Sequence, residues 1–162
     1  MANFNDAIVK TLAREGGAKF TDVPSDKGGA TKYGISQAAY PNLDIRNLTE
    51  QQARDIYKRD YWDRVGGDNI QSQLVAENIF DTAVNMGVRT ASKLAQLCID
   101  TTPADGVLGK NSVDAINAAD ANQFLAAYTI SKVARYADIC NKDKSQTKFL
   151  LGWINRTLGA TA

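Results

Sequence analysis

The sequence predicts a mainly α-helical fold with one small β-hairpin near the N-terminus. Over most of the 162 residues, apolar side chains recur at intervals of three and four, which places them on one face of a helix. Residues 17–36 differ, because they contain four glycines and Pro24, which favour a loop and a short hairpin. The chain is long enough for one compact domain, or for one with two small lobes.

The first helix is predicted over residues 3–15. Gly16 and Gly17 end it, because glycine is common just past a helix C-terminus. Glu15 therefore lies at the helix end, directly before the glycine-rich segment. The apolar face of this helix consists of Phe4, Ala7, Ile8, Thr11 and Leu12.

Helical character dominates the rest of the chain. Thr49 and Gln52 have the spacing of a capping box, which opens a helix that Gly66 and Gly67 end. A change of composition near residue 88 divides the chain into residues 1–88 and 89–162, which we expect to pack as one compact unit. Further helices are predicted over residues 36–39, 74–86, 90–99, 111–118, 121–140 and 147–158.

Composition excludes several classes of function. Nineteen basic and eighteen acidic residues give a net charge of +1, which predicts no nucleic-acid partner. The sequence contains no histidine, which excludes Ser-His-Asp and Cys-His catalysis and removes the commonest zinc ligand. The carboxylates lack a recognisable metal-ligand spacing, so we expect no metal and no cofactor. Carboxylates are therefore the natural acid and base groups.

The cysteines and the apolar runs bear on the compartment. Cys98 and Cys140 lie in separate apolar stretches, so we expect buried free thiols in a reduced compartment, with a disulfide or a reactive thiol as the alternative. No apolar run approaches the ~20 residues that a membrane span needs, and the N-terminus lacks a signal region. We expect the chain to be kept in a cytoplasm, so an external target requires another factor to let it through.

Three residues around the glycine-rich segment form a candidate catalytic set. A helix end that faces a short hairpin brings Glu15, Asp26 and Thr31 toward one cleft, which suits acid/base hydrolysis of a glycosidic bond. The alternative is structural. Glu15 is then a surface residue at a helix C-terminus, Asp26 makes an Asx turn, and Thr31 is a strand residue.

The same segment resembles a known enzyme family. Glu15-Gly16-Gly17, followed by Pro24-x-Asp26-x-Gly28-Gly29-x-Thr31-x-Tyr33-Gly34-Ile35, resembles the signature of glycoside hydrolase family 108, the phage-type lysozymes often described as N-acetylmuramidases. The likeness continues through Tyr57, Tyr61-Trp62, Phe80-Asp81-x-Ala83-Val84-Asn85-x-Gly87 and Ala95-Gln96-Leu97. Asp105-Gly106-x-x-Gly109, Arg135-Tyr136 and Gly152-Trp153-x-x-Arg156 resemble the predicted peptidoglycan-binding region of that family.

The resemblance implies a lysozyme-like α+β fold, a helical bundle in which the hairpin forms one wall of the cleft. Residues 1–88 become the catalytic region and residues 89–162 the peptidoglycan-binding region. Glu15 is implied as the general acid, partly buried so that it stays protonated near neutral pH. Asp26 is implied as the base or electrostatic partner, and Thr31 as the group that holds the attacking water, with inversion by analogy with other phage lysozymes.

One departure from the family pattern leaves the second carboxylate open. The family usually places Tyr directly after Glu-Gly-Gly and the Pro-x-Asp element two residues earlier. This chain reads Ala18-Lys19-Phe20, as though two residues were inserted. Asp22 also lies in the altered loop, so it is the alternative to Asp26.

Aromatic side chains are candidates for holding sugar rings. Tyr33, Tyr57, Tyr61 and Trp62 can pack on sugars, and Asn85 can contact an acetamido or hydroxyl group. Core packing is the alternative for every aromatic, and it is the favoured one for Tyr57 and Trp62.

Together these features predict a monomeric phage endolysin. Its partner is bacterial peptidoglycan, in which it hydrolyses the β-1,4 bond between N-acetylmuramic acid and N-acetylglucosamine. We expect action from the host cytoplasm after a holin permeabilises the membrane. A lytic transglycosylase and a non-catalytic wall-binding module remain the alternatives.

Overall fold

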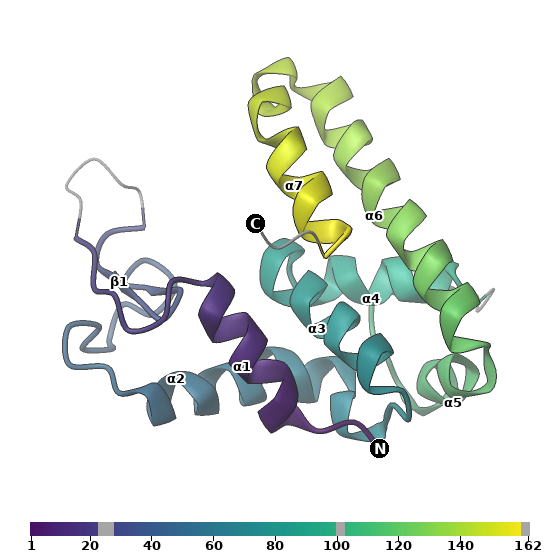
Figure 1. The fold of residues 1–162 in the computed structure, drawn as a ribbon, viewed down its shortest axis with the longest axis horizontal. Coiled ribbons are helices and arrows are strands. Elements are labelled where there is room, and N and C mark those ends of the chain that lie inside the picture. Colours follow the sequence, from purple (N-terminus) through teal and green to yellow (C-terminus); the bar gives the residue numbers. More distant parts are fainter. Residues whose placement is uncertain (23–27, 100–102, 160–162) are drawn as a thin grey trace.

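The computed structural model of the chain describes residues 1–22, 28–99 and 103–159. Within these residues helices dominate, and the only sheet is a two-stranded antiparallel hairpin near the N-terminus (Figure 1). The predicted mainly α-helical fold with one N-terminal hairpin is therefore confirmed. The elements are α1 (Phe4–Arg14), β1 (Thr31–Lys32), β2 (Ile35–Ser36), α2 (Glu50–Tyr57), α3 (Gln73–Met86), α4 (Val88–Leu97), α5 (Lys110–Ala118), α6 (Ala121–Lys142) and α7 (Leu150–Thr157).

Helix α3 joins the two halves of the molecule. It packs against α1 on one side and against α4 and α6 on others. Helices α6 and α7 form a helical hairpin that projects from the rest of the structure, and the β1–β2 hairpin lies at the opposite end (Figure 1). The C-terminal end of α7 returns toward α3, so the last helix approaches the N-terminal half.

Helix α2 begins as the sequence predicts. The Thr49 hydroxyl accepts a hydrogen bond from the Gln52 backbone N–H, and the Gln52 side chain accepts one from the Thr49 backbone N–H, which completes the capping box. The helix then widens into a π-helical turn over Lys58–Trp62 and tightens into a 3₁₀ turn. Gly66 ends it in a left-handed conformation, with φ of +69°.

Three of the predicted helices differ from those observed. Helix α4 begins at Val88, before Thr90, because Gly87 adopts φ of +87° and joins α3 to α4 without a linker. The last helix is divided, since a 3₁₀ segment over Lys144–Phe149 precedes α7. The short helix over residues 36–39 does not form. The Gln37 side-chain amide donates to three backbone carbonyls between positions 40 and 43, which holds this segment in turns.

Four aromatic rings form the centre of the N-terminal core. Phe4, Trp62 and Phe80 meet edge to face with centroids 5.5–6.0 Å apart, and Tyr57 meets Phe80 in the same way at 6.4 Å. All four are buried, and each fully buried apolar side chain contributes about 1.5–3 kcal/mol. Gly67 lies so close to the Trp62 ring that a Cβ there would come within 2.3 Å of it, so the packing requires glycine.

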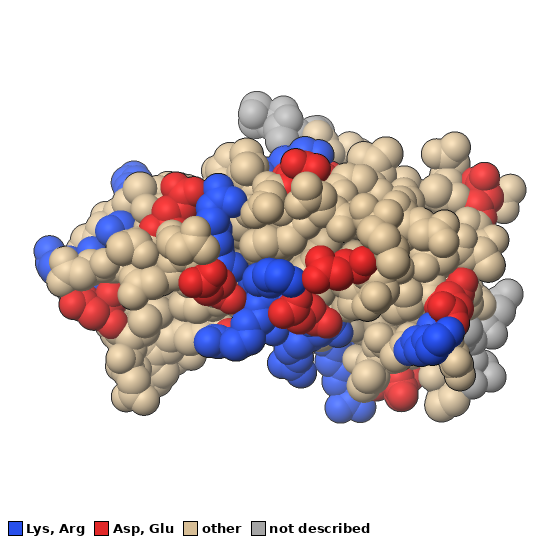
Figure 2. Space-filling view, turned by 90° about the horizontal axis from the view of Figure 1, so that it is seen from below, with Lys and Arg blue, Asp and Glu red and all other residues tan. Residues whose placement is uncertain are grey.

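The surface charges, the cysteines and the helix lengths can be compared with the expectations from composition. Figure 2 shows that basic side chains gather in the middle of the face seen from below, with acidic side chains next to them on both sides. Cys98 and Cys140 are both free thiols, as expected, but only Cys140 is buried and Cys98 is half-buried. Among the described residues, no helix combines the length and the apolar character that crossing a membrane requires.

Candidate active site

Glu15 lies where α1 ends and the chain reverses. Its backbone N–H donates to the Thr11 carbonyl at 2.9 Å as the last helical hydrogen bond. Gly16 and Gly17 follow with φ of +89° and +57°, a left-handed conformation that glycine adopts without strain. The chain therefore turns directly after Glu15, and the Glu15 side chain remains 23% exposed. The side chain is therefore partly buried, as expected, while its role as general acid stays a prediction.

The hairpin turn is held against this helix end by its backbone. Tyr33 and Gly34 form the two-residue turn with φ of +54° and +74°, the pattern of a type I′ turn. The Tyr33 N–H donates to the Gly17 carbonyl at 3.0 Å, and the Tyr33 carbonyl accepts from the Tyr57 hydroxyl at 2.9 Å. Both backbone groups of Tyr33 are thus paired, which offsets the cost of a left-handed non-glycine residue.

Gly34 brings the turn into contact with Glu15. A Cβ at position 34 would lie 2.7 Å from the Glu15 Cβ and 2.6 Å from the Tyr57 hydroxyl oxygen. Such distances are shorter than any real Cβ contact, so only glycine allows this approach. The hairpin is therefore beside the candidate acid, as the sequence analysis predicts.

The other candidate catalytic residues are placed only in part. Thr31 lies in β1, half-buried, and its hydroxyl donates to the Gly29 carbonyl at 3.2 Å. Its backbone pairs with Thr21 through two hydrogen bonds, so the segment before Asp22 runs beside β1. Asp22 is exposed, and Asp26 lies outside the described residues. The assignment of the second carboxylate stays a prediction.

The candidate sugar platforms differ in their exposure. Trp62 is fully buried, and its indole N–H donates to Asp68 at 2.6 Å. Tyr57 is 2% exposed and Tyr33 is 8% exposed, so their rings belong to the core. Tyr61 is half-buried and lies 5.7 Å from the Tyr57 ring. Tyr61 is therefore the one of these four rings with surface to offer a sugar.

Asn85 lies one turn beyond Asp81 at the C-terminal end of α3. It is exposed, and its side-chain N–H donates to the Tyr136 hydroxyl on α6 at 3.0 Å. The Tyr136 ring stacks on Trp153 of α7 with centroids 5.0 Å apart. Asn85 thus connects α3 to the α6–α7 hairpin, and its contact with a sugar stays a prediction.

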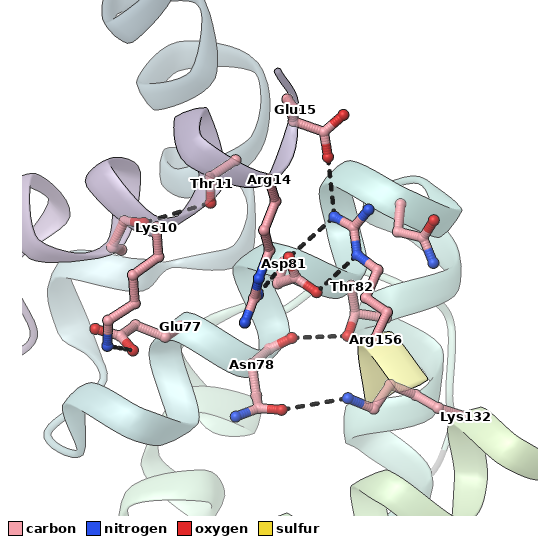
Figure 3. Close-up of polar contacts among 12 residues, drawn as sticks. Lys10, Thr11, Arg14, Glu15, Glu77, Asn78, Asp81, Thr82, Lys132 and Arg156 are labelled. Carbon is pink, nitrogen blue, oxygen red and sulfur yellow. Dashed lines mark hydrogen bonds and ion pairs between the residues drawn. The ribbon is translucent and has the colours of Figure 1, made fainter. Parts of the chain in front are cut away.

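An arginine from the last helix reaches Glu15. Arg156 donates from Nη2 to Glu15 Oε1 at 3.0 Å, and it donates from Nε and Nη2 to the two oxygens of Asp81 at 3.2 and 2.9 Å (Figure 3). Arg14 adds a hydrogen bond to Asp81 Oδ1 at 3.0 Å. The four side chains alternate in sign, so each charge has an opposite neighbour.

The charge of Glu15 contributes to the pKa of two neighbouring side chains, Tyr57 and Arg156. Burial raises the pKa of Tyr57, and the negative charge of Glu15 raises it further, so Tyr57 remains a hydrogen-bond donor. Burial by itself lowers the pKa of Arg156, but the hydrogen bonds and charges of Asp81 and Glu15 outweigh it and raise the pKa.

A cavity of about 320 Å³ between α1, α3, α6 and α7 is lined partly by Arg14, Asp81 and Arg156.

Asp81 and Arg156 are the site residues that the sequence analysis did not assign. Both lie in segments that carry the family resemblance, and this resemblance is the sequence signal that could have identified them. Their proximity to Glu15 depends on the packing of α1, α3 and α7. Among the described residues, no cluster of Cys, Asp or Glu is arranged to hold a metal ion.

Comparison with known proteins finds two family matches and a similar solved structure. Residues 8–87 match the family described as glycosyl hydrolase 108, and residues 85–158 match the family described as predicted peptidoglycan domain. Among solved structures, the chain is similar to SagA of Brucella abortus, with 27% identity and a TM-score of 0.72 over 96% of this chain and 94% of that one. No curated protein matches the sequence.

The two family matches overlap at residues 85–87, at the C-terminal end of α3, and together they contain the residues of the site. Glu15 and Asp81 lie in the first matched region, and Arg156 lies in the second. The chain is therefore a glycosidase of the glycoside hydrolase 108 family with a lysozyme-like fold, with a peptidoglycan-binding domain on its C-terminal side and peptidoglycan as its partner.

Proposed function

We propose that this protein is an N-acetylmuramidase, which hydrolyses the β-1,4 bond between N-acetylmuramic acid and N-acetylglucosamine in peptidoglycan. The observation that carries the proposal is the placement of Glu15. It is a partly buried carboxyl group at a helix end, in contact with the hairpin turn through Gly34. The family membership supplies the reaction class, and this carboxyl group supplies an acid in the corresponding motif.

In the proposed reaction Glu15 protonates the oxygen of the leaving sugar. The bond to the muramic acid then breaks as positive charge develops on its ring, and a water molecule completes the hydrolysis. A positioned general acid contributes about 10²–10⁴-fold to such a rate. Thr31, on the hairpin that contacts Glu15, is the proposed holder of that water, and Asp26 or Asp22 is the proposed second carboxylate.

Analysis of the products tests the bond and the reaction. Purified peptidoglycan is digested with the wild-type enzyme, and the soluble fragments are examined by mass spectrometry before and after borohydride reduction. We expect reducible N-acetylmuramic acid ends. Anhydro-muramic ends would indicate a lytic transglycosylase, and reducible N-acetylglucosamine ends would indicate cleavage of the other glycosidic bond. Either result would contradict the proposal.

The second carboxylate is tested by matched variants of the altered loop. Asp26→Asn and Asp22→Asn each remove one charge and keep the side-chain shape. We expect wall lysis to be lost with Asp26→Asn and retained with Asp22→Asn. The opposite pattern would assign the role to Asp22 and would overturn the assignment of Asp26.

We also propose a biological role as a monomeric phage endolysin that reaches the wall from the host cytoplasm after a holin permeabilises the membrane. The sequence resemblance to phage-type lysozymes supports this role. Expression in the cytoplasm of a bacterial host tests it. We expect rapid lysis when a holin is co-expressed and continued growth without one. Equal lysis in both cultures would contradict the need for a holin.

A further inference from the structure

Helix α7 places a cation on the candidate acid from the far end of the chain. Arg156 and Glu15 are 141 residues apart in sequence, yet Nη2 of the arginine lies 3.0 Å from Oε1 of the glutamate. The exposed fractions of the two side chains are 24% and 23%, so the pair is largely shielded from water. Shielding from water strengthens the attraction between the two charges relative to that of a fully exposed pair.

The orientation of Arg156 is fixed from behind by Asp81. Two hydrogen bonds join the guanidinium to both carboxylate oxygens of Asp81, and this bidentate geometry fixes the plane of the guanidinium. Asp81 is itself held by Arg14 at 3.0 Å. Figure 3 shows the resulting chain of contacts, in which Arg156 lies between Asp81 and Glu15. A lysine ammonium carries the same charge but cannot supply this planar fork.

Only one oxygen of Glu15 is used by Arg156. The hydrogen bond goes to Oε1, and within the described part of the chain no side chain donates to Oε2. A protonated carboxyl group can keep its acceptor bond at Oε1 and carry the proton on Oε2. The contact with Arg156 is therefore compatible with both protonation states that an acid catalyst passes through.

We propose that Arg156 is a positioning residue that fixes the Glu15 carboxyl group for proton transfer, so that the C-terminal region completes the catalytic site. The inference rests on the proposed function, because it takes Glu15 to be the general acid. It assigns to the region matched as a predicted peptidoglycan domain a role inside the active site. Correct orientation matters because a displacement of about 1 Å can cost ~10²-fold in rate.

Three variants test this role, with initial rates measured on purified peptidoglycan at saturating substrate. Arg156→Met removes the charge and the fork, and we expect a loss of about 10–100-fold. Arg156→Lys keeps the charge without the fork, and we expect a loss of about 10-fold. Arg54→Met is the matched control, because Arg54 on α2 pairs with Glu50, four residues away on the same helix, at 2.8 Å and with no other partner among the described residues. We expect it to keep the wild-type rate.

The pH dependence separates positioning from a purely structural bridge. Activity falls at alkaline pH when the general acid loses its proton. Removing a cation next to a carboxylate disfavours the ionised form, so the alkaline limb of Arg156→Met should move to higher pH, while that of Arg156→Lys should stay in place. The other charged or titratable side chains on the described elements around Glu15 are Arg14 on α1, Lys32 on β1, Tyr57 on α2 and Asp81 on α3.

Each outcome in a folded variant is read as support for the role of Arg156 or as evidence against it. Folding is checked by thermal melting, and if Arg156→Met does not fold, Arg156→Lys carries the test. A lowered rate with a shifted limb in Arg156→Met, or a lowered rate of folded Arg156→Lys, supports the inference. Wild-type rates and an unmoved alkaline limb in the folded variants would overturn it. If the role of Arg156 is overturned in this way while Glu15→Gln is inactive in the same assay, the proposed function still stands.

Discussion

The β1–β2 hairpin and helix α7 both reach Glu15, but they do so with different kinds of contact. The hairpin approaches through its backbone: Gly34 packs against the Glu15 Cβ, and the Tyr33 backbone donates to the Gly17 carbonyl and accepts from the Tyr57 hydroxyl. Helix α7 approaches through one long side chain, whose charge meets the Glu15 carboxylate at 3.0 Å. The hairpin therefore sets where the residue sits, and the arginine sets how its carboxyl group is turned.

The difference predicts two kinds of sensitivity. Backbone packing at atomic contact tolerates no added volume, so changes at the hairpin should reduce stability and activity together. An ion pair between side chains can be lost while the fold survives, so changes at Arg156 should reduce activity more than stability. Variants of the two regions can therefore be told apart by measuring both properties.

Among the variants that test this comparison, Gly34→Ala should change the stability most. The added Cβ would collide with the Glu15 Cβ and the Tyr57 hydroxyl, and alanine would be strained at φ of +74°. Overpacking and backbone strain together should cost about 2–4 kcal/mol of unfolding free energy. We also expect lytic activity to fall at least ~10-fold, because the hairpin must move away from Glu15.

Gly29→Ala is the matched control for this prediction. Gly29 also has a positive φ, of +67°, but a Cβ there would meet only the Gln37 Cβ at 3.7 Å, which is ordinary contact. Its cost should be limited to the backbone strain. Urea unfolding of the two variants measures the difference, and equal stabilities would show that the close approach of Gly34 to Glu15 has no energetic weight.

An intermediate effect is expected from Tyr57→Phe. The substitution keeps the buried ring but removes the hydroxyl that donates to the Tyr33 carbonyl at 2.9 Å. An unsatisfied buried carbonyl should cost about 1–3 kcal/mol. Activity should fall as well, because the turn beside Glu15 loses one of its two anchors. Denaturant unfolding and wall lysis together test this. If the unfolding free energy and the lytic activity were both unchanged, the Tyr57 hydroxyl would have no role in holding the turn.

The smallest effect is expected at Lys132 on α6, which is 4% exposed and donates to Asn78 at 3.2 Å. Burial lowers its pKa below the ordinary value of 10.5. The folded state therefore holds this proton less tightly than the unfolded state, and stability should rise with pH between the lowered pKa and 10.5. Below that window the cost of the buried charge is fully present.

Lys132→Met should remove this cost. We expect a gain of about 1 kcal/mol at pH 7, or ~2–4 °C in Tm, with unchanged wall lysis. The advantage over the wild type should shrink as the pH approaches 10. Thermal melts at both pH values provide the measurement. A variant less stable than the wild type at pH 7 would show that the contacts of Lys132 with Asn78 and the Tyr128 ring outweigh its burial.

Local signals in the sequence predicted much of the fold. The capping box at Thr49 and the glycines after Glu15 each act within a few residues, so they can be read without knowing the fold. The start of α4 was misjudged because Gly87 takes the place of a side-chain cap. The turns at residues 36–39 depend on the Gln37 side chain, whose three carbonyl partners a helical pattern does not reveal.

The site was less predictable, because most of it depends on tertiary contacts. Glu15 was found through its motif, which is local. Arg156 and Asp81 are 75 residues apart and meet only after α3 and α7 pack together. The sequence does not distinguish a buried aromatic from one that holds a sugar; core packing was favoured for Trp62, and its burial and its bond to Asp68 agree with that.

The central claim is that Glu15 is the general acid, and Glu15→Gln tests it most directly. The substitution keeps an acceptor oxygen for Arg156 but cannot donate the catalytic proton. We predict that lysis of purified peptidoglycan falls by about 10²–10⁴-fold while the thermal transition stays close to that of the wild type. Glu77→Gln, which alters an α1–α3 ion pair with Lys10 at 2.6 Å, is the control and should remain active. Full lytic activity of Glu15→Gln would contradict the account.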